Sequence, residues 1–205
     1  HGPPDLPGRA SSPLADVVLV AGDVHRGTEA TRGMRAVFPE RPVVCVAGNH
    51  GYYDAHLDTT QPSLRRSADP LPETGAKDPV PTGGYVLERD ELVLGGLRIL
   101  GCTFWTDFTL FAAKRASAMR ACRANVDDYR RIHLLRTRRA LRPRDTARIH
   151  QTSVRWLRER LADTTRSGVR ATVVLTHHAP APRSVDPRYA DSLTSAAFVA
   201  RQERL

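Results

Sequence analysis

Two short apolar runs, each ending in glycine and polar residues, constrain the fold of this chain more than any other feature. The runs 17–21 and 43–47 are rich in valine, and the chain continues as GDVHR after the first and GNH after the second. Continuous β-branched runs of this length are typical of strands buried on both faces, as in a parallel sheet covered by helices. Apolar residues at helical spacing over residues 28–38 predict a helix between the two strands, so the unit is β-α-β.

Polar side chains stand at the point where each of these strands ends. Asp23 follows the first strand, and Asn49 and His50 follow the second. The carboxyl ends of adjacent parallel strands meet at one rim of a sheet, so we expect these three side chains to lie close together. A carboxylate, an amide oxygen and an imidazole suit Mn, Fe, Zn or a similar cation. The sequence therefore predicts a metal site at this rim.

A third apolar run repeats the pattern near the end of the chain. Residues 171–176 read ATVVLT and continue into His177, His178, Ala179 and Pro180. Together, GDVHR, GNH and VVLTHHAP resemble the motifs of the calcineurin-like metallophosphoesterases, a superfamily that includes purple acid phosphatases and many phosphodiesterases. The three motifs occur in the family's order, and the resemblance extends over most of the chain.

The resemblance implies that two divalent or transition metal ions (Mn, Fe, Zn or similar) bind at the strand ends. Asp23 would bridge them, and Asn49 and His177 would be ligands of the second ion. The family pattern also has a D-x-H before the first motif and a G-H-x-H after the last, and neither is found here. Gly51 stands where the family has Asp or Glu after GNH. We therefore expect residues 1–205 to be a single metallophosphoesterase domain truncated at both ends.

The same resemblance implies roles for three further residues. His50 would be the catalytic residue that protonates the leaving oxygen or stabilises the negative charge developing there, and Arg26 and His178 would contact the substrate. The expected reaction is hydrolysis of a phosphomonoester or phosphodiester by attack of a metal-bound hydroxide. The alternative is a catalytically impaired or non-catalytic domain of the same fold that binds a polyanion or a protein partner, which the absent motifs and Gly51 favour.

The expected fold class is α/β, a metallophosphoesterase-type sandwich of two mixed sheets flanked by helices. Residues 85–102 contain three short apolar runs, which predict strands over 85–87, 91–94 and 97–101. The Gly-Gly pair between the last two is a hairpin turn signal.

Three helices are expected in the rest of the chain, over residues 54–64, from Asp145 onward and over 192–205. The second of them carries His150, which we expect to be exposed rather than a metal ligand. The Arg-dense stretch 109–142 is either a solvated helix and loop or a lid whose Arg side chains meet a phosphate.

Charge and cysteine content restrict the partners and the compartment. The net charge is +9, but 29 of the 31 basic residues are Arg, a skew that codon usage in a GC-rich genome produces. We therefore expect a small-molecule phosphate ester as the substrate rather than nucleic acid, and make no prediction of the oligomeric state. The three cysteines are interpreted as reduced, buried thiols of a cytoplasmic protein. No apolar stretch approaches the roughly 18 residues of a membrane-spanning helix, so no membrane is expected as a partner.

Overall fold

The computed structural model of the chain describes residues 15–24, 33, 36–69, 82–165 and 167–204. Its strands are β1 (Val18–Val20), β2 (Val43–Cys45), β3 (Ala55–His56), β4 (Gly84–Val86), β5 (Asp90–Leu94), β6 (Leu97–Cys102), β7 (Ile132–Leu134), β8 (Arg139–Ala140) and β9 (Ala171–Thr176). Its α-helices are α2 (Leu57–Ser67), α3 (Arg115–Asn125), α4 (Asp128–Arg131) and α5 (Pro143–Ala162). Its 3₁₀ turns are η2 (His50–Tyr52), η3 (Ala112–Lys114), η4 (Pro182–Ser184), η5 (Pro187–Tyr189) and η6 (Leu193–Ala197).

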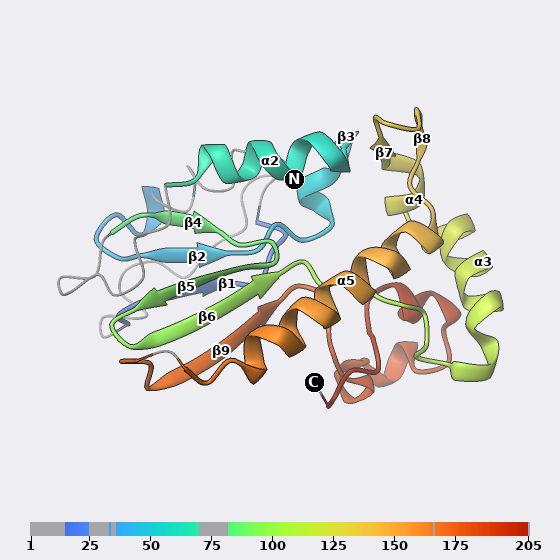
Figure 1. Ribbon diagram of the computed structural model, residues 1–205. Coiled ribbons are helices and arrows are strands. Elements are labelled where there is room, and N and C mark those ends of the chain that lie inside the picture. The colour runs from blue at the N-terminus through green and yellow to red at the C-terminus, as the bar shows by residue number, and fades with distance from the viewer. Residues whose placement is uncertain (1–14, 25–32, 34–35, 70–81, 166, 205) are drawn as a thin grey trace.

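Two three-stranded sheets pack face to face and form the centre of the fold (Figure 1). In the first sheet β2 pairs in parallel with both β1 and β4. In the second, β6 pairs antiparallel with β5 and parallel with β9. Val44 of β2 and Val46, which follows the end of that strand, are buried in one cluster with Leu92 and Ile99 from the second sheet. The predicted α/β sandwich is thereby confirmed, although the described strands of the first sheet are all parallel. Most of the helix predicted over 28–38 lies outside the described residues.

Helices cover the outer faces of this sandwich (Figure 1). Because successive residues of a strand point to opposite faces, Cys45 of β2 faces away from the second sheet and shares a buried cluster with Leu64 of α2. On the other side, Leu157 of α5 is buried in one cluster with Leu100 and Cys102 of β6. None of the described helices is long and apolar enough to cross a membrane.

The three strands predicted between residues 85 and 102 are confirmed as β4, β5 and β6, with ends within one residue of those expected. The turn between β5 and β6 consists of Gly95 and Gly96, which have φ values of 53° and 84°. A two-residue hairpin with positive φ at both positions follows the right-handed twist of the strands, and glycine adopts it without steric strain. The three cysteines, Cys45, Cys102 and Cys122, are buried free thiols, as expected.

Two of the predicted helices differ from the structure. The first begins at Leu57 rather than at residue 54, because Ala55 and His56 pair with β7 of a third, small sheet, β3-β7-β8. The helix predicted over 192–205 is wrong, since the described part of that range, 192–204, contains only the short 3₁₀ turn η6. The backbone after η6 pairs instead with the loop that follows β9: Ala179 N donates to Phe198 O at 3.0 Å, and Ala200 N donates to Ala179 O at 2.8 Å.

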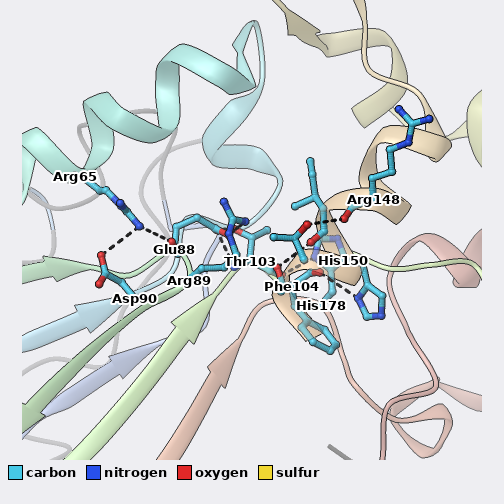
Figure 2. Close-up of polar contacts among 12 residues, drawn as sticks. Arg65, Glu88, Arg89, Asp90, Thr103, Phe104, Arg148, His150 and His178 are labelled. Carbon is cyan, nitrogen blue, oxygen red and sulfur yellow. Dashed lines mark hydrogen bonds and ion pairs between the residues drawn. The ribbon is translucent and has the colours of Figure 1, made fainter. Parts of the chain in front are cut away.

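The helix α5 begins at Pro143, close to its predicted start, but His150 on it is buried rather than exposed. Figure 2 shows the imidazole against the loop that follows β6. His150 Nδ1 lies 3.2 Å from both the Phe104 and the Trp105 carbonyl oxygens, so this nitrogen carries the proton and donates. The ring contacts Phe104 edge to face at 4.6 Å. His150 therefore ties α5 to the end of β6.

Burial lowers the pKa of His150 below its usual value, which makes the fold sensitive to acid. As the pH falls below about 6.5, His150 gains a proton in the unfolded chain but resists protonation in the fold. The free energy of unfolding should therefore decrease, by at most about 1.4 kcal/mol per pH unit from this residue. The variant His150→Phe should lose less stability than the wild type between about pH 7 and about pH 5, measured by urea unfolding.

His133, exposed on β7, provides the control for this experiment. His133→Phe should keep the wild-type pH dependence of the unfolding free energy. The same pH dependence in His150→Phe as in the wild type would contradict the assignment.

Candidate metal centre

The structure brings Asp23, Asn49, His50 and His177 together at the carboxyl ends of the strands. Asp23 follows β1, Asn49 and His50 follow β2, and His177 follows β9. The first three therefore belong to one sheet and His177 to the other, so the site lies where the two sheets meet. A contact of 2.7 Å between His177 Nδ1 and the Ala21 carbonyl oxygen joins the two sheets at this point.

The hydrogen bonds of His177 and Asn49 determine which atoms face the site. A carbonyl oxygen only accepts, so the proton of a neutral His177 ring is on Nδ1 and Nε2 carries a lone pair. Asn49 donates from Nδ2 to Asp128 Oδ1 at 2.7 Å, which turns its own Oδ1 toward the site. That oxygen is 2.8 Å from His177 Nε2, and Asp23 Oδ2 is 3.4 Å from the same nitrogen. Three electron-pair donors thus converge.

Converging electron-pair donors repel one another unless a proton or a cation lies between them. Ligand atoms about 2.0–2.2 Å from a metal ion are about 2.8–3.6 Å from each other, and the two distances at His177 Nε2 fall in that range. The second ring nitrogen of His177 is held by a backbone carbonyl, as is usual for histidine ligands. The three side chains therefore fit a single cation.

The described residues do not contain a cluster of three His, Cys, Asp or Glu side chains that could hold a metal. Asp23 and His177 are two such residues, and an amide, Asn49, supplies the third donor. The two-ion arrangement implied by the resemblance therefore stays a prediction.

His50 lies at the edge of this site and is accessible to solvent. Its side chain is 51% exposed, and its Nδ1 is 3.6 Å from Asp23 Oδ2. The backbone amide of His50 donates to Asp23 Oδ1 at 3.0 Å, which orients the carboxylate. The His50 ring contacts the Tyr53 ring at 4.4 Å between centroids. This position allows the imidazole to exchange a proton with a molecule bound beside Asp23.

Gly48 makes the close approach of the two strand ends possible. Its φ is 71°, in the left-handed region, and a Cβ at this position would stand 2.2 Å from Asp23 Oδ1. Asp23 itself has a φ of 61°, so both strands end in a left-handed turn. A side chain at Gly48 would push the carboxylate away from Asn49 and His177.

Gly48→Ala should therefore reduce both stability and metal binding. The positive φ alone costs about 1 kcal/mol for alanine, and displacement of Asp23 adds to it. Gly168→Ala is the matched control, because Gly168 has a φ of 80° with no atom within 4 Å of the added Cβ. Thermal unfolding and metal content should both change more in Gly48→Ala, and equal behaviour of the two variants would contradict this account of the site.

Two further residues of this site, Asp128 and Tyr53, were not predicted from the sequence. Asp128 lies on α4 and is buried; its Oδ1 accepts hydrogen bonds from Asn49 Nδ2 at 2.7 Å and from Tyr53 OH at 2.8 Å. Burial raises the pKa of Asp128, and the two hydrogen bonds oppose that shift. Burial and the Asp128 charge raise the pKa of Tyr53, so its hydroxyl remains a donor.

The only sequence signal for this contact was the run of two acidic residues within the Arg-dense stretch 109–142. The structure places α4 of this stretch against the site, but its Arg side chains have acidic partners: Arg131 pairs with Asp54 and Arg130 with Asp127. The lid, in which Arg side chains would meet a phosphate, stays a prediction. The described hydrogen bond from α4 to a metal-site residue is made by the Asp128 carboxylate.

His178 has a different environment from His177. It is 2% exposed, its Nδ1 lies 3.0 Å from the Thr103 carbonyl oxygen, and its ring stacks on Trp105 at 5.1 Å. Thr103 is held in turn by the buried Glu88 carboxylate, which accepts from its backbone amide at 2.9 Å (Figure 2). Burial lowers the pKa of His178 to about 3, so the ring is neutral. These contacts favour a structural role over the substrate contact that we predicted.

Two further positions complete the comparison with the sequence. Arg26, predicted to contact the substrate, lies outside the described residues. Gly51 is buried in η2, and a Cβ there would approach the Ala47 side chain to 3.2 Å. Its φ is not in the left-handed region, so the backbone itself does not require glycine.

One comparison with known proteins identifies a relationship. The family model described as calcineurin-like phosphoesterase matches residues 7–201 of the chain. No curated protein and no solved structure matches this chain. The family match covers the four side chains predicted at the strand ends, Asp23, Asn49, His50 and His177.

Proposed function

The chain belongs to the calcineurin-like phosphoesterase family, and from this membership we propose that it is a metal-dependent hydrolase of phosphate esters. The observation that carries the proposal is that Asp23 and Asn49 each place an oxygen beside His177 Nε2, where the carboxyl ends of the two sheets meet. Asp23 would bridge two divalent or transition metal ions, with Asn49 and His177 as ligands of one of them.

Bound divalent cations supply Lewis-acid activation of water and neutralise charge on the phosphoryl oxygens. The residues of this chain provide the rest. The Asp23 carboxylate brings the negative charge that holds the cations, and the His50 amide fixes its orientation. His50 is the side chain that would move a proton: its exposed imidazole donates to the leaving oxygen or stabilises the charge developing on it.

The family and the exposure of His50 support a proposal for the substrate class. His50 is half exposed, so a phosphomonoester or phosphodiester could approach it from solvent. We propose a small-molecule phosphate ester as the substrate. The free thiols Cys45, Cys102 and Cys122 favour a reducing compartment, and we propose the cytoplasm as the location.

Metal removal and replacement tests this function. The purified protein should hydrolyse bis-p-nitrophenyl phosphate or p-nitrophenyl phosphate, lose the activity after treatment with a chelator, and recover it on addition of Mn²⁺. Metal binding without hydrolysis of either compound would support the alternative of a non-catalytic domain. Hydrolysis that survives complete metal removal would refute the proposed chemistry.

A further inference from the structure

The side chain of Asn49 donates a hydrogen bond to Asp128, a residue 79 positions away in the sequence. Asp128 is 1% exposed and Asn49 3% exposed, so their contact is shielded from water. Asp128 Oδ1 accepts from both Asn49 Nδ2 and Tyr53 OH, and Asp128 Oδ2 is buried without a hydrogen-bond partner among the described residues. Both described hydrogen bonds of the Asp128 carboxylate therefore go to the segment after β2, which carries Asn49 and Tyr53.

The helix α4 is attached to that same turn at a second point. Arg131 at its end forms an ion pair with Asp54, and the Asp54 backbone amide donates to the Arg131 carbonyl oxygen at 2.9 Å. The Arg131 guanidinium also lies 4.4 Å from the centre of the Tyr53 ring. These contacts fix the position of Asp128 relative to Asn49, so the carboxylate is a rigid reference point for the amide.

The orientation of the Asn49 amide matters because its two ends have nearly the same shape and opposite hydrogen-bonding character. With Oδ1 toward His177 Nε2, the amide presents a lone pair to a cation. With the ends exchanged, Nδ2 would point a hydrogen at that nitrogen and would repel a cation. A carboxylate only accepts, so Asp128 can bond the nitrogen end of the amide and repels the oxygen end.

We propose that Asp128 is a positioning residue that locks the Asn49 amide with its oxygen toward His177 and Asp23 and so prepares the site for a metal ion. This inference rests on the proposed function, because it concerns the same metal site. The positioning role differs from a purely structural role, in which Asp128 would only anchor α4. In that case, exchanging the carboxylate and the amide between positions 49 and 128 would not change the affinity for metal.

A charge-conserving swap separates these two roles. In Asp128→Asn, the isosteric amide can bond either end of Asn49, so affinity for Mn²⁺, measured by isothermal titration calorimetry, should fall by about 10–100-fold, the usual range for such partners. Adding Asn49→Asp should restore Mn²⁺ binding, because both ends of the new carboxylate are oxygens and the amide introduced at position 128 then donates to one of them. The two substitutions should therefore be strongly non-additive.

Asp127→Asn is the control, because Asp127 is the exposed neighbour that pairs with Arg130. It should keep wild-type Mn²⁺ affinity, and thermal unfolding should show that every variant is folded. Unchanged Mn²⁺ affinity in Asp128→Asn, or no recovery in the double variant, would overturn the positioning role while the proposed function stands. Absence of Mn²⁺ binding in the wild type would overturn the metal site itself, and with it both proposals.

Discussion

Asp23→Asn is expected to abolish both metal binding and phosphoesterase activity. The asparagine oxygen can still accept the hydrogen bond from the His50 amide, so the turn after β1 should be preserved. The negative charge is lost, and a neutral amide does not bridge two cations as a carboxylate does. Substitutions of residues that hydrogen-bond metal ligands lower activity by about 10–100-fold. Loss of the bridging carboxylate itself should lower the activity by more than that. Metal analysis of the purified variant and its rate on bis-p-nitrophenyl phosphate measure the two effects.

Asp186→Asn is a suitable control for this substitution. Asp186 is an exposed carboxylate that pairs with Arg188, and none of its described contacts is with Asp23, Asn49 or His177. It should retain wild-type metal content and rate. If Asp23→Asn retained both as well, Asp23 would have no role in the site, and another set of ligands would have to be sought.

His50→Ala should have the second-largest effect, with a different pattern. The metal content should remain close to that of the wild type, because His50 lies at the exposed edge of the site and the three converging donors do not include it. The rate should fall by about 10²–10⁴-fold, the usual contribution of a positioned acid or base. The decrease should be smaller for p-nitrophenyl esters than for alkyl esters, because a good leaving group needs no proton.

Steady-state rates on a p-nitrophenyl and an alkyl phosphate, together with metal analysis, test this role. His133→Ala, at the exposed position of β7, should leave both quantities unchanged. A His50→Ala protein that lost its metal would instead make His50 a ligand. An equal decrease on both substrates would show that the imidazole acts on the phosphate rather than on the leaving group.

The strand-end residues could be found from the sequence because their positions follow from local rules. Short valine-rich runs form buried strands, glycine permits the turn, and a polar residue directly after the strand must lie at the rim. His177 follows β9 directly, Asp23 lies a few residues beyond β1 and Asn49 and His50 a few residues beyond β2, and the structure brings all four together. The hairpin at residues 95–96 was equally accessible, because two glycines with positive φ specify one type of turn.

The failures concern segments whose conformation depends on distant partners. Residues 192–205 have a helical pattern, but the backbone at Val199 bridges to Ala179 and replaces helical hydrogen bonds with tertiary ones. His150 was expected to be exposed, and the carbonyl groups of a loop about 45 residues earlier hold it inside the protein. Local periodicity contains no information about either partner.

The sequence by itself therefore determined the family, the α/β architecture and the side chains at three strand ends. Only the tertiary structure decided which atom of each side chain faces the site. The orientation of the Asn49 amide depends on Asp128, and the tautomer of His177 depends on the Ala21 carbonyl group. Residue types and their spacing along a strand are local properties, whereas the direction of a hydrogen bond depends on which distant group the fold places beside it, and this is known only when the whole chain is folded.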